Sequence, residues 1–167
     1  SKPFDDLQWQ TLQGLIYGPS MHKALLFPGI QLFLLRCKYR GDSVFIVSHK
    51  TEFGHYDSTH TPLREVALKW MELRGLFNKT KFGLTKDRVY FEKTREEKVG
   101  RISSLNLDVF VDDLKEVFVE NDFPKIKKIL FTTDSDDKQD LVICNNWSAI
   151  ANEVLGPITD EDCKVLA

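Results

Sequence analysis

The sequence is poor in cysteine, carries no excess of positive charge and contains no long apolar run. Its three cysteines include no C-x-x-C pair, which argues against a disulfide scaffold or a cysteine-based metal cluster and favours a reducing compartment, the cytoplasm. With 23 basic and 25 acidic residues the net charge is −2, so no basic field for nucleic acid is expected. No apolar run is long enough to span a bilayer, so no membrane partner is expected either.

What the chain does contain is the composition of an ordinary globular protein. Of its 167 residues, 42% are hydrophobic and 29% are charged, which is enough apolar material for one core. We therefore expect a single domain over residues 1–167, with 1–27 as a small helical cap or lead-in and 158–167 as a tail.

Apolar strands alternate along the chain with amphipathic helices. Continuous apolar runs suit strands covered on both faces, and apolar residues at i, i+3 and i+4 suit helices. The alternation predicts an α/β fold, a three-layer sandwich around a mainly parallel, Rossmann-like sheet, with a small cap or none. The expected strands are Val44–Val47, Val89–Phe91, Asp108–Val111, Lys127–Phe131 and Leu141–Cys144. The expected helices lie within 7–18, 28–41, 61–75, 94–105, 114–119, 146–156 and 158–167.

Three helix starts carry capping signals. Thr61, followed by Pro62, fits an N-cap with proline at the first helical position. Thr94 and Glu97 form the Thr-x-x-Glu pattern of a capping box. Asn146 fits the N-cap of the last long helix.

Two adjacent carboxylates, Asp112 and Asp113, follow the apolar strand directly. Two carboxylates repel each other, so such a pair needs a cation or a wet cleft, and ligands of α/β sheets bind beyond the carboxyl ends of the strands. This arrangement predicts a metal site. The alternative is a strand end at which Asp113 caps the following short helix.

A serine and a lysine join the carboxylates in the same predicted cleft. Ser48 ends one strand, and Lys98 precedes Asp112 near the start of a helix. A hydroxyl and an ammonium bind phosphoryl oxygens, whereas a carboxylate pair binds Mg²⁺. Neutralising a phosphoryl group in this way is the main demand of phosphoryl transfer.

These motifs resemble those of the haloacid dehalogenase-like hydrolase superfamily, which consists mostly of phosphatases. Pro28–Gly29, the helix that ends at Gly41 and the strand that ends in Ser48 are similar to its second motif and lead-in. Lys98 resembles the third motif, and Val109–Asp113 resembles the fourth. Ile129–Phe131, Val142 and Trp147 resemble its final strand and helix, so that the resemblance spans residues 25–155.

The resemblance implies a role for each matched residue. Ser48 would bind the transferred phosphoryl group, with His49 and Lys50 beside it contacting the substrate. Lys98 would neutralise the phosphoryl group and steady the nucleophile; Lys93 is the alternative lysine. The metal ligands would be Asp112 and Asp113, holding Mg²⁺ directly or through water.

The superfamily's first motif, a strand followed by Asp-x-Asp that supplies the nucleophile, has no counterpart at the expected place. Asp5 and Asp6 lack both the strand and the spacing. Asp134 and Asp136 have the spacing, but they come too late in the chain and lead directly into another strand. The start at Ser1 rather than Met favours a segment missing before it; a degenerate member or a likeness of fold alone are the alternatives.

We therefore expect a Mg²⁺-dependent phosphohydrolase that acts through an aspartyl-phosphate and is impaired in this chain by the missing nucleophile. The alternative is a non-catalytic binding or regulatory module on the same fold. A receiver like that of response regulators fits less well, because its acidic pair follows the first strand. The substrate would be a phosphorylated small molecule or macromolecule. Without the central strand two strand edges would be open, which favours a missing segment, a rearranged sheet or a homo-oligomer.

Overall fold

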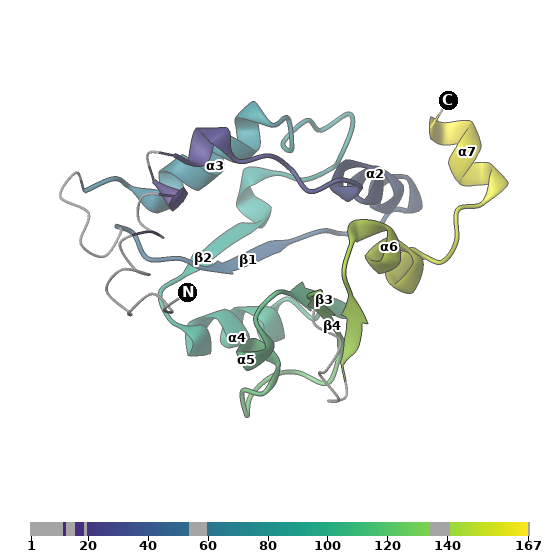
Figure 1. Cartoon of the computed structure of the whole chain (residues 1–167). Coiled ribbons are helices and arrows are strands. Elements are labelled where there is room, and N and C mark those ends of the chain that lie inside the picture. Colours follow the sequence, from purple (N-terminus) through teal and green to yellow (C-terminus); the bar gives the residue numbers. More distant parts are fainter. Residues whose placement is uncertain (1–11, 13–15, 19, 54–59, 134–140, 167) are drawn as a thin grey trace.

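The computed structural model describes residues 12, 16–18, 20–53, 60–133 and 141–166 (Figure 1). Within these ranges strands and helices alternate as the sequence predicts. The strands are β1 (Ile46–His49), β2 (Val89–Glu92), β3 (Val109–Asp112), β4 (Lys127–Phe131) and β5 (Val142–Cys144). The α-helices are α2 (Ile30–Arg40), α3 (Leu63–Leu73), α4 (Arg95–Ser104), α5 (Lys115–Phe118), α6 (Trp147–Leu155) and α7 (Asp160–Leu166). Two 3-10 turns are η1 (Met21–Lys23) and η2 (Lys86–Arg88).

The strands form two parallel sheets instead of the one sheet that the sequence suggested. β1 pairs with β2, with Ser48 opposite Phe91. The second sheet has the order β3-β4-β5, and its register places Asp112 opposite Leu130. All these pairings are parallel, which confirms the predicted α/β class.

The two sheets share one hydrophobic core although they do not pair with each other. Val47 of β1 and Phe110 of β3 belong to the same buried cluster. That cluster also contains Val99 and Ile102, the inward residues of α4. Figure 1 shows α4 and α5 on one side of the β1–β2 ribbon and α3 on the other. Val109 and Val111, which alternate with Phe110 along β3, belong to a second cluster with Phe33 of α2 and Trp147 of α6, whose rings lie 5.2 Å apart.

The carboxyl ends of β1, β2 and β3 meet at the start of α4. His49 ends β1, and its Nε2 forms a hydrogen bond of 2.8 Å with the carbonyl of Lys93, just after β2. Lys98, in the first turn of α4, forms an ion pair with Asp112 at the end of β3. Strand-end residues of both sheets therefore lie on one rim.

β1 and β3 each have one unused edge in the part of the chain that the structure describes. β1 pairs only with β2 there, and β3 pairs only with β4. Both strands contribute to one core and have their carboxyl ends on one rim. The described residues therefore leave the backbone groups of one edge of each strand without a strand partner.

Two of the three capping predictions are confirmed. The Thr94 Oγ1 accepts a hydrogen bond of 3.1 Å from the Glu97 N–H, and the Asn146 Oδ1 accepts one of 2.8 Å from the Ala149 N–H. The prediction for Thr61 is wrong.

The helix after Thr61 begins later than predicted because Pro62 is held in extended backbone. Pro62 has ψ 92° and forms an isolated antiparallel bridge with Phe53. The N–H of Leu63 donates to the Glu52 carbonyl at 2.8 Å, so α3 starts at Leu63 with Pro62 as its N-cap. This local pairing competes with the capping preference of threonine and prevails.

Several element boundaries also differ by a few residues. The first strand lies at Ile46–His49 and not at Val44–Val47. Its ends are set by the pairing with β2, which runs from Ile46 opposite Val89 to His49 opposite Glu92. The helix predicted after Pro28–Gly29 is α2, and Gly41 ends it with φ 80°. The helix predicted at 7–18 falls mostly outside the described residues.

The C-terminal tail forms the predicted short helix, α7, at the outer side of the molecule in Figure 1. Arg36 of α2 is 2% exposed and binds the segment that precedes α7. Its guanidinium donates to the carbonyls of Gly156 and Pro157 and pairs with Asp162 at 3.3 Å. Among the described residues, no helix has both the length and the apolar character needed to cross a membrane.

The three cysteines should differ sharply in reactivity. Cys37 and Cys144 are buried and Cys163 is exposed. Burial, with a smaller contribution from Asp42, raises the pKa of the Cys37 thiol to about 11, so little thiolate forms near neutral pH. We expect a disulfide reagent such as Ellman's to modify Cys163 quickly in the folded protein and the other two only after unfolding. Rapid modification of all three in the native protein would contradict this packing.

Candidate functional site

The site is built around the end of β3. Its residues alternate in burial, so that Phe110 and Asp112 face inward toward α4. Asp112 is 8% exposed, whereas Asp113, the next residue, lies past the strand and is exposed. The adjacent carboxylates therefore occupy different environments, one inside the protein and one in water.

Lys98 of α4 meets the buried carboxylate. The burial of its neighbours Val99 and Ile102 fixes the orientation of the helix, and Lys98 itself is only 5% exposed. Its Nζ donates a hydrogen bond to the Oδ2 of Asp112. The same Nζ lies 5.6 Å from the centre of the Phe110 ring, within the range of a cation–π contact.

The electrostatics of Asp112 reflect two opposing effects. Burial raises the pKa of the Asp112 carboxyl above its ordinary value, because desolvation penalises the charged form. The Lys98 ammonium and a hydrogen bond of 2.9 Å from the Leu114 N–H to Oδ1 oppose that rise. Both carboxylate oxygens of Asp112 therefore have a donor inside the protein.

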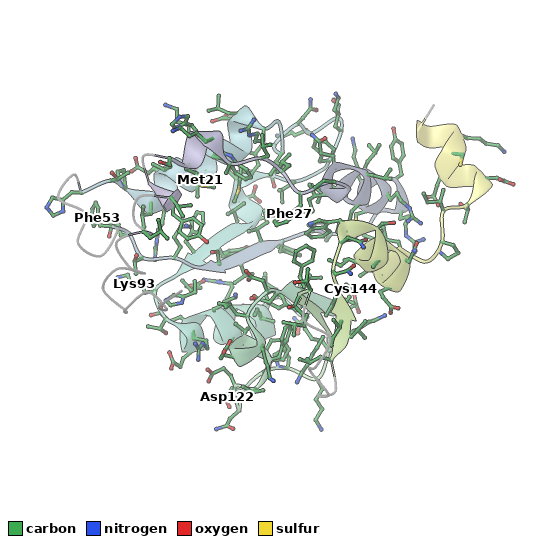
Figure 2. All side chains as sticks on the ribbon, viewed as in Figure 1. Met21, Phe27, Phe53, Lys93, Asp122 and Cys144 are labelled. Carbon is green, nitrogen blue, oxygen red and sulfur yellow. The ribbon has the colours of Figure 1, made fainter. Side chains whose placement is uncertain are left out.

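Lys93, the alternative lysine, is not in contact with Asp112. It is exposed, between β2 and α4, and Figure 2 shows it at the edge of the molecule. Its backbone N–H donates to the Glu97 Oε2 at 2.7 Å, and its carbonyl bonds to His49. The structure thus brings Lys98, and not Lys93, to Asp112.

Ser48 lies on the neighbouring sheet, next to the end of β1, and is half-buried. It faces away from α4, since the alternating residue Val47 belongs to the α4 core. His49 is exposed and anchors the start of α4 through Lys93. Ser48 and His49 lie on the same rim as Asp112, although β1 and β3 belong to different sheets.

Lys50 continues the line of β1. Its N–H donates to the Glu92 carbonyl at 2.9 Å, and its own carbonyl accepts from Arg64 Nε at 2.9 Å. Its ammonium lies 4.3 Å from the centre of the Tyr17 ring. Burial lowers the pKa of Lys50, because desolvation disfavours the charged amine.

The described residues of this rim offer few ligands for a metal ion. Within the described ranges no group of three or more His, Cys, Asp or Glu side chains gathers in a way that could hold a metal ion. Asp112 and Asp113 remain as adjacent hard oxygen donors. The other acidic residues considered from the sequence, Asp5, Asp6, Asp134 and Asp136, lie outside the described residues.

Sequence reasoning missed two parts of this site. One is the Tyr17–Lys50 contact, which joins segments 33 residues apart that share no local pattern. The other is the donor to the Asp112 Oδ1, a backbone N–H whose direction depends on the turn at Leu114. The Asx-turn tendency of aspartate is the one signal that could have indicated it.

Comparisons with protein-family models, with curated proteins and with solved structures find no match to this chain.

Proposed function

We propose that this chain provides most of the active site of a Mg²⁺-dependent phosphohydrolase of the haloacid dehalogenase-like type, which hydrolyses phosphate monoesters through an aspartyl-phosphate. One observation carries the proposal: Lys98 and Asp112 are both buried and form an ion pair where β3 ends. A buried ammonium paired with the first of two adjacent carboxylates, on a rim that also has a serine hydroxyl, suits a phosphoryl group and its counter-ion.

Each residue has a defined task in this proposal. The Ser48 hydroxyl donates a hydrogen bond to a phosphoryl oxygen, and His49 and Lys50 contact the rest of the substrate. The Lys98 ammonium has three N–H donors, so it can keep Asp112 and still donate to the phosphoryl group and the nucleophile. Fixed donors of this kind stabilise charge that develops on phosphoryl oxygens without reorganising during the reaction.

The proposed metal is held by Asp112 and Asp113. Mg²⁺ takes one or two protein carboxylates and keeps water and substrate phosphate as its other ligands, so this pair fits in chemistry and in number. When bound, the ion would neutralise phosphoryl charge as a Lewis acid. Asp112 retains lone pairs on both oxygens beyond the bonds that Lys98 and Leu114 make.

The nucleophile has to come from a strand that ends in Asp-x-Asp, and none of the described residues supplies it. The unused edges of β1 and β3 support a place for such a strand between the two sheets. Its carboxyl end would then fall on the same rim as Ser48, Lys98 and Asp112. The aspartate would attack phosphorus as the P–O bond to the leaving alcohol breaks and the alcohol takes up a proton. Water would then attack the phosphorus of the aspartyl-phosphate, which releases inorganic phosphate and regenerates the aspartate.

The 167 residues alone should therefore show almost no hydrolysis of p-nitrophenyl phosphate with Mg²⁺. The check is a colorimetric assay of purified protein, with enzyme-free buffer as the baseline. Robust turnover that Asp5→Ala or Asp134→Ala abolishes would overturn this account of the missing nucleophile. The alternative is a binding or regulatory module on the same fold. Such a module would bind phosphate but would not hydrolyse a phosphate monoester even when a strand with Asp-x-Asp is added to the chain.

A further inference from the structure

The ammonium of Lys50 is half-buried at the rim, yet among the described residues no carboxylate pairs with it. Its Nζ lies 4.3 Å from the centre of the Tyr17 ring. Lys98, by contrast, is neutralised by Asp112. A desolvated ammonium without a counter-charge is costly to keep, which is typical of a group that binds an anion from outside.

The backbone of Lys50 is fixed, so its side chain has a defined starting point. The hydrogen bond from its N–H to Glu92 extends the β1–β2 ladder by one residue, and Arg64 of α3 holds its carbonyl. Because the ladder continues, strand alternation places Lys50 on the same face as Ser48. The two Cα atoms are then about 6.6 Å apart, at a rise of about 3.3 Å per residue.

We propose that Lys50, seated on Tyr17, is a second anion site, and that the substrate is a compact phosphomonoester bearing a second anionic group, either carboxylate or phosphate. The inference rests on the proposed function, since Ser48 marks the phosphoryl position. Because Ser48 and Lys50 are two residues apart on one face of the strand, the two anionic groups that they bind belong to one compact ligand. A short carbon chain between the anionic groups is compatible with this placement.

Binding is the appropriate measurement, because it does not require the nucleophile. The full chain with Mg²⁺ is titrated, by calorimetry, with methylphosphonate, phosphonopropionate and propylenebisphosphonate. The first carries a single anionic group, the second adds a carboxylate and the third a second phosphonate. We expect both two-anion ligands to bind about tenfold or more tightly than methylphosphonate, as one added charge-assisted contact would give. The stronger of the two identifies the second group.

Lys50→Met should remove this advantage, so that all three ligands bind with similar affinity, and Lys50→Arg should retain it. Lys125→Met is the matched control, because Lys125 is an exposed lysine just before β4, at the opposite end of the strands. That variant should leave the advantage intact. Circular dichroism of each variant confirms that it is folded before titration.

The proposal is overturned if the two-anion ligands bind no better than methylphosphonate, or if Lys50→Met keeps their advantage. Failure of the proposed function gives a different result: Ser48→Ala leaves methylphosphonate binding unchanged while Lys50→Met still weakens the two-anion ligands. If none of the three ligands binds, both proposals are wrong.

Discussion

Lys98→Met should lower the free energy of unfolding by about 3–5 kcal/mol, because it leaves the buried Asp112 carboxylate without its ammonium. Asp112 is 8% exposed and Lys98 is 5% exposed, so little water can replace the lost partner. Urea denaturation measures the change. The matched control is Lys127→Met, since Lys127 pairs with Glu153 at 2.8 Å on the surface. That change should cost no more than about 1 kcal/mol.

The double variant Lys98→Met/Asp112→Asn should recover most of this loss. Asparagine keeps an oxygen that can accept from the Leu114 N–H, and no unpaired charge remains. A loss in the double variant as large as in Lys98→Met would mean that packing, and not charge, accounts for the effect. A loss in Lys98→Met as small as in Lys127→Met would contradict a buried ion pair.

The defect of Lys98→Met should also depend on pH. Burial already raises the pKa of Asp112, and removing the ammonium that opposes this effect raises it further. The folded state then binds a proton more tightly than the unfolded state, whose carboxyl titrates near 3.8. The unfolding free energy of the variant therefore falls as pH rises from 3.8 through the raised pKa of the folded-state carboxyl. The loss of stability relative to the unsubstituted protein becomes smaller as pH is lowered toward 3.8.

The second large effect is expected from adding a strand. We expect an extension before Ser1, with an apolar strand of about six residues followed by Asp-x-Asp and a flexible linker, to pair with β1 and β3. Hydrogen exchange of the β1 and β3 amides should then slow by about a hundredfold, equivalent to about 2.7 kcal/mol of added local stability. Amides of β5, at the far edge of the other sheet, should change less.

A proline version of the same extension is the control for this result. Two prolines in the middle of the added strand remove its N–H donors and prevent pairing. Equal exchange of the β1 and β3 amides with both extensions would mean that the two edges do not accept a strand.

Local structure was largely predictable from the sequence, because its causes are local. The Thr94–Glu97 box starts α4 as expected, and inward packing of Val99 and Ile102 orients the helix so that Lys98 can reach Asp112. The prediction failed where a contact with a residue outside the local segment determines the backbone conformation. Pro62 stays extended because it bridges to Phe53, and this delays the start of α3.

The division into two sheets could not be predicted for a similar reason. The strand sequences indicate that β1 and β3 are apolar and buried, and in the structure both faces of each strand pack in hydrophobic clusters. They do not specify which strands pair, because pairing depends on every other strand that is present. Pairing β1 with β3 directly would have given one sheet, but in the described part of the chain these two strands do not pair with each other.

The most direct test of the central claim is Mg²⁺-dependent hydrolysis of p-nitrophenyl phosphate by the strand-extended chain. We expect turnover at least about a thousandfold above that of the unextended chain, which is a small share of the rate enhancement that enzymes reach over uncatalysed reactions. That turnover should be lost when the first aspartate of the added Asp-x-Asp is replaced by asparagine, and also with Lys98→Met. An extended chain whose β1 and β3 amides are protected but which shows no turnover would contradict the account.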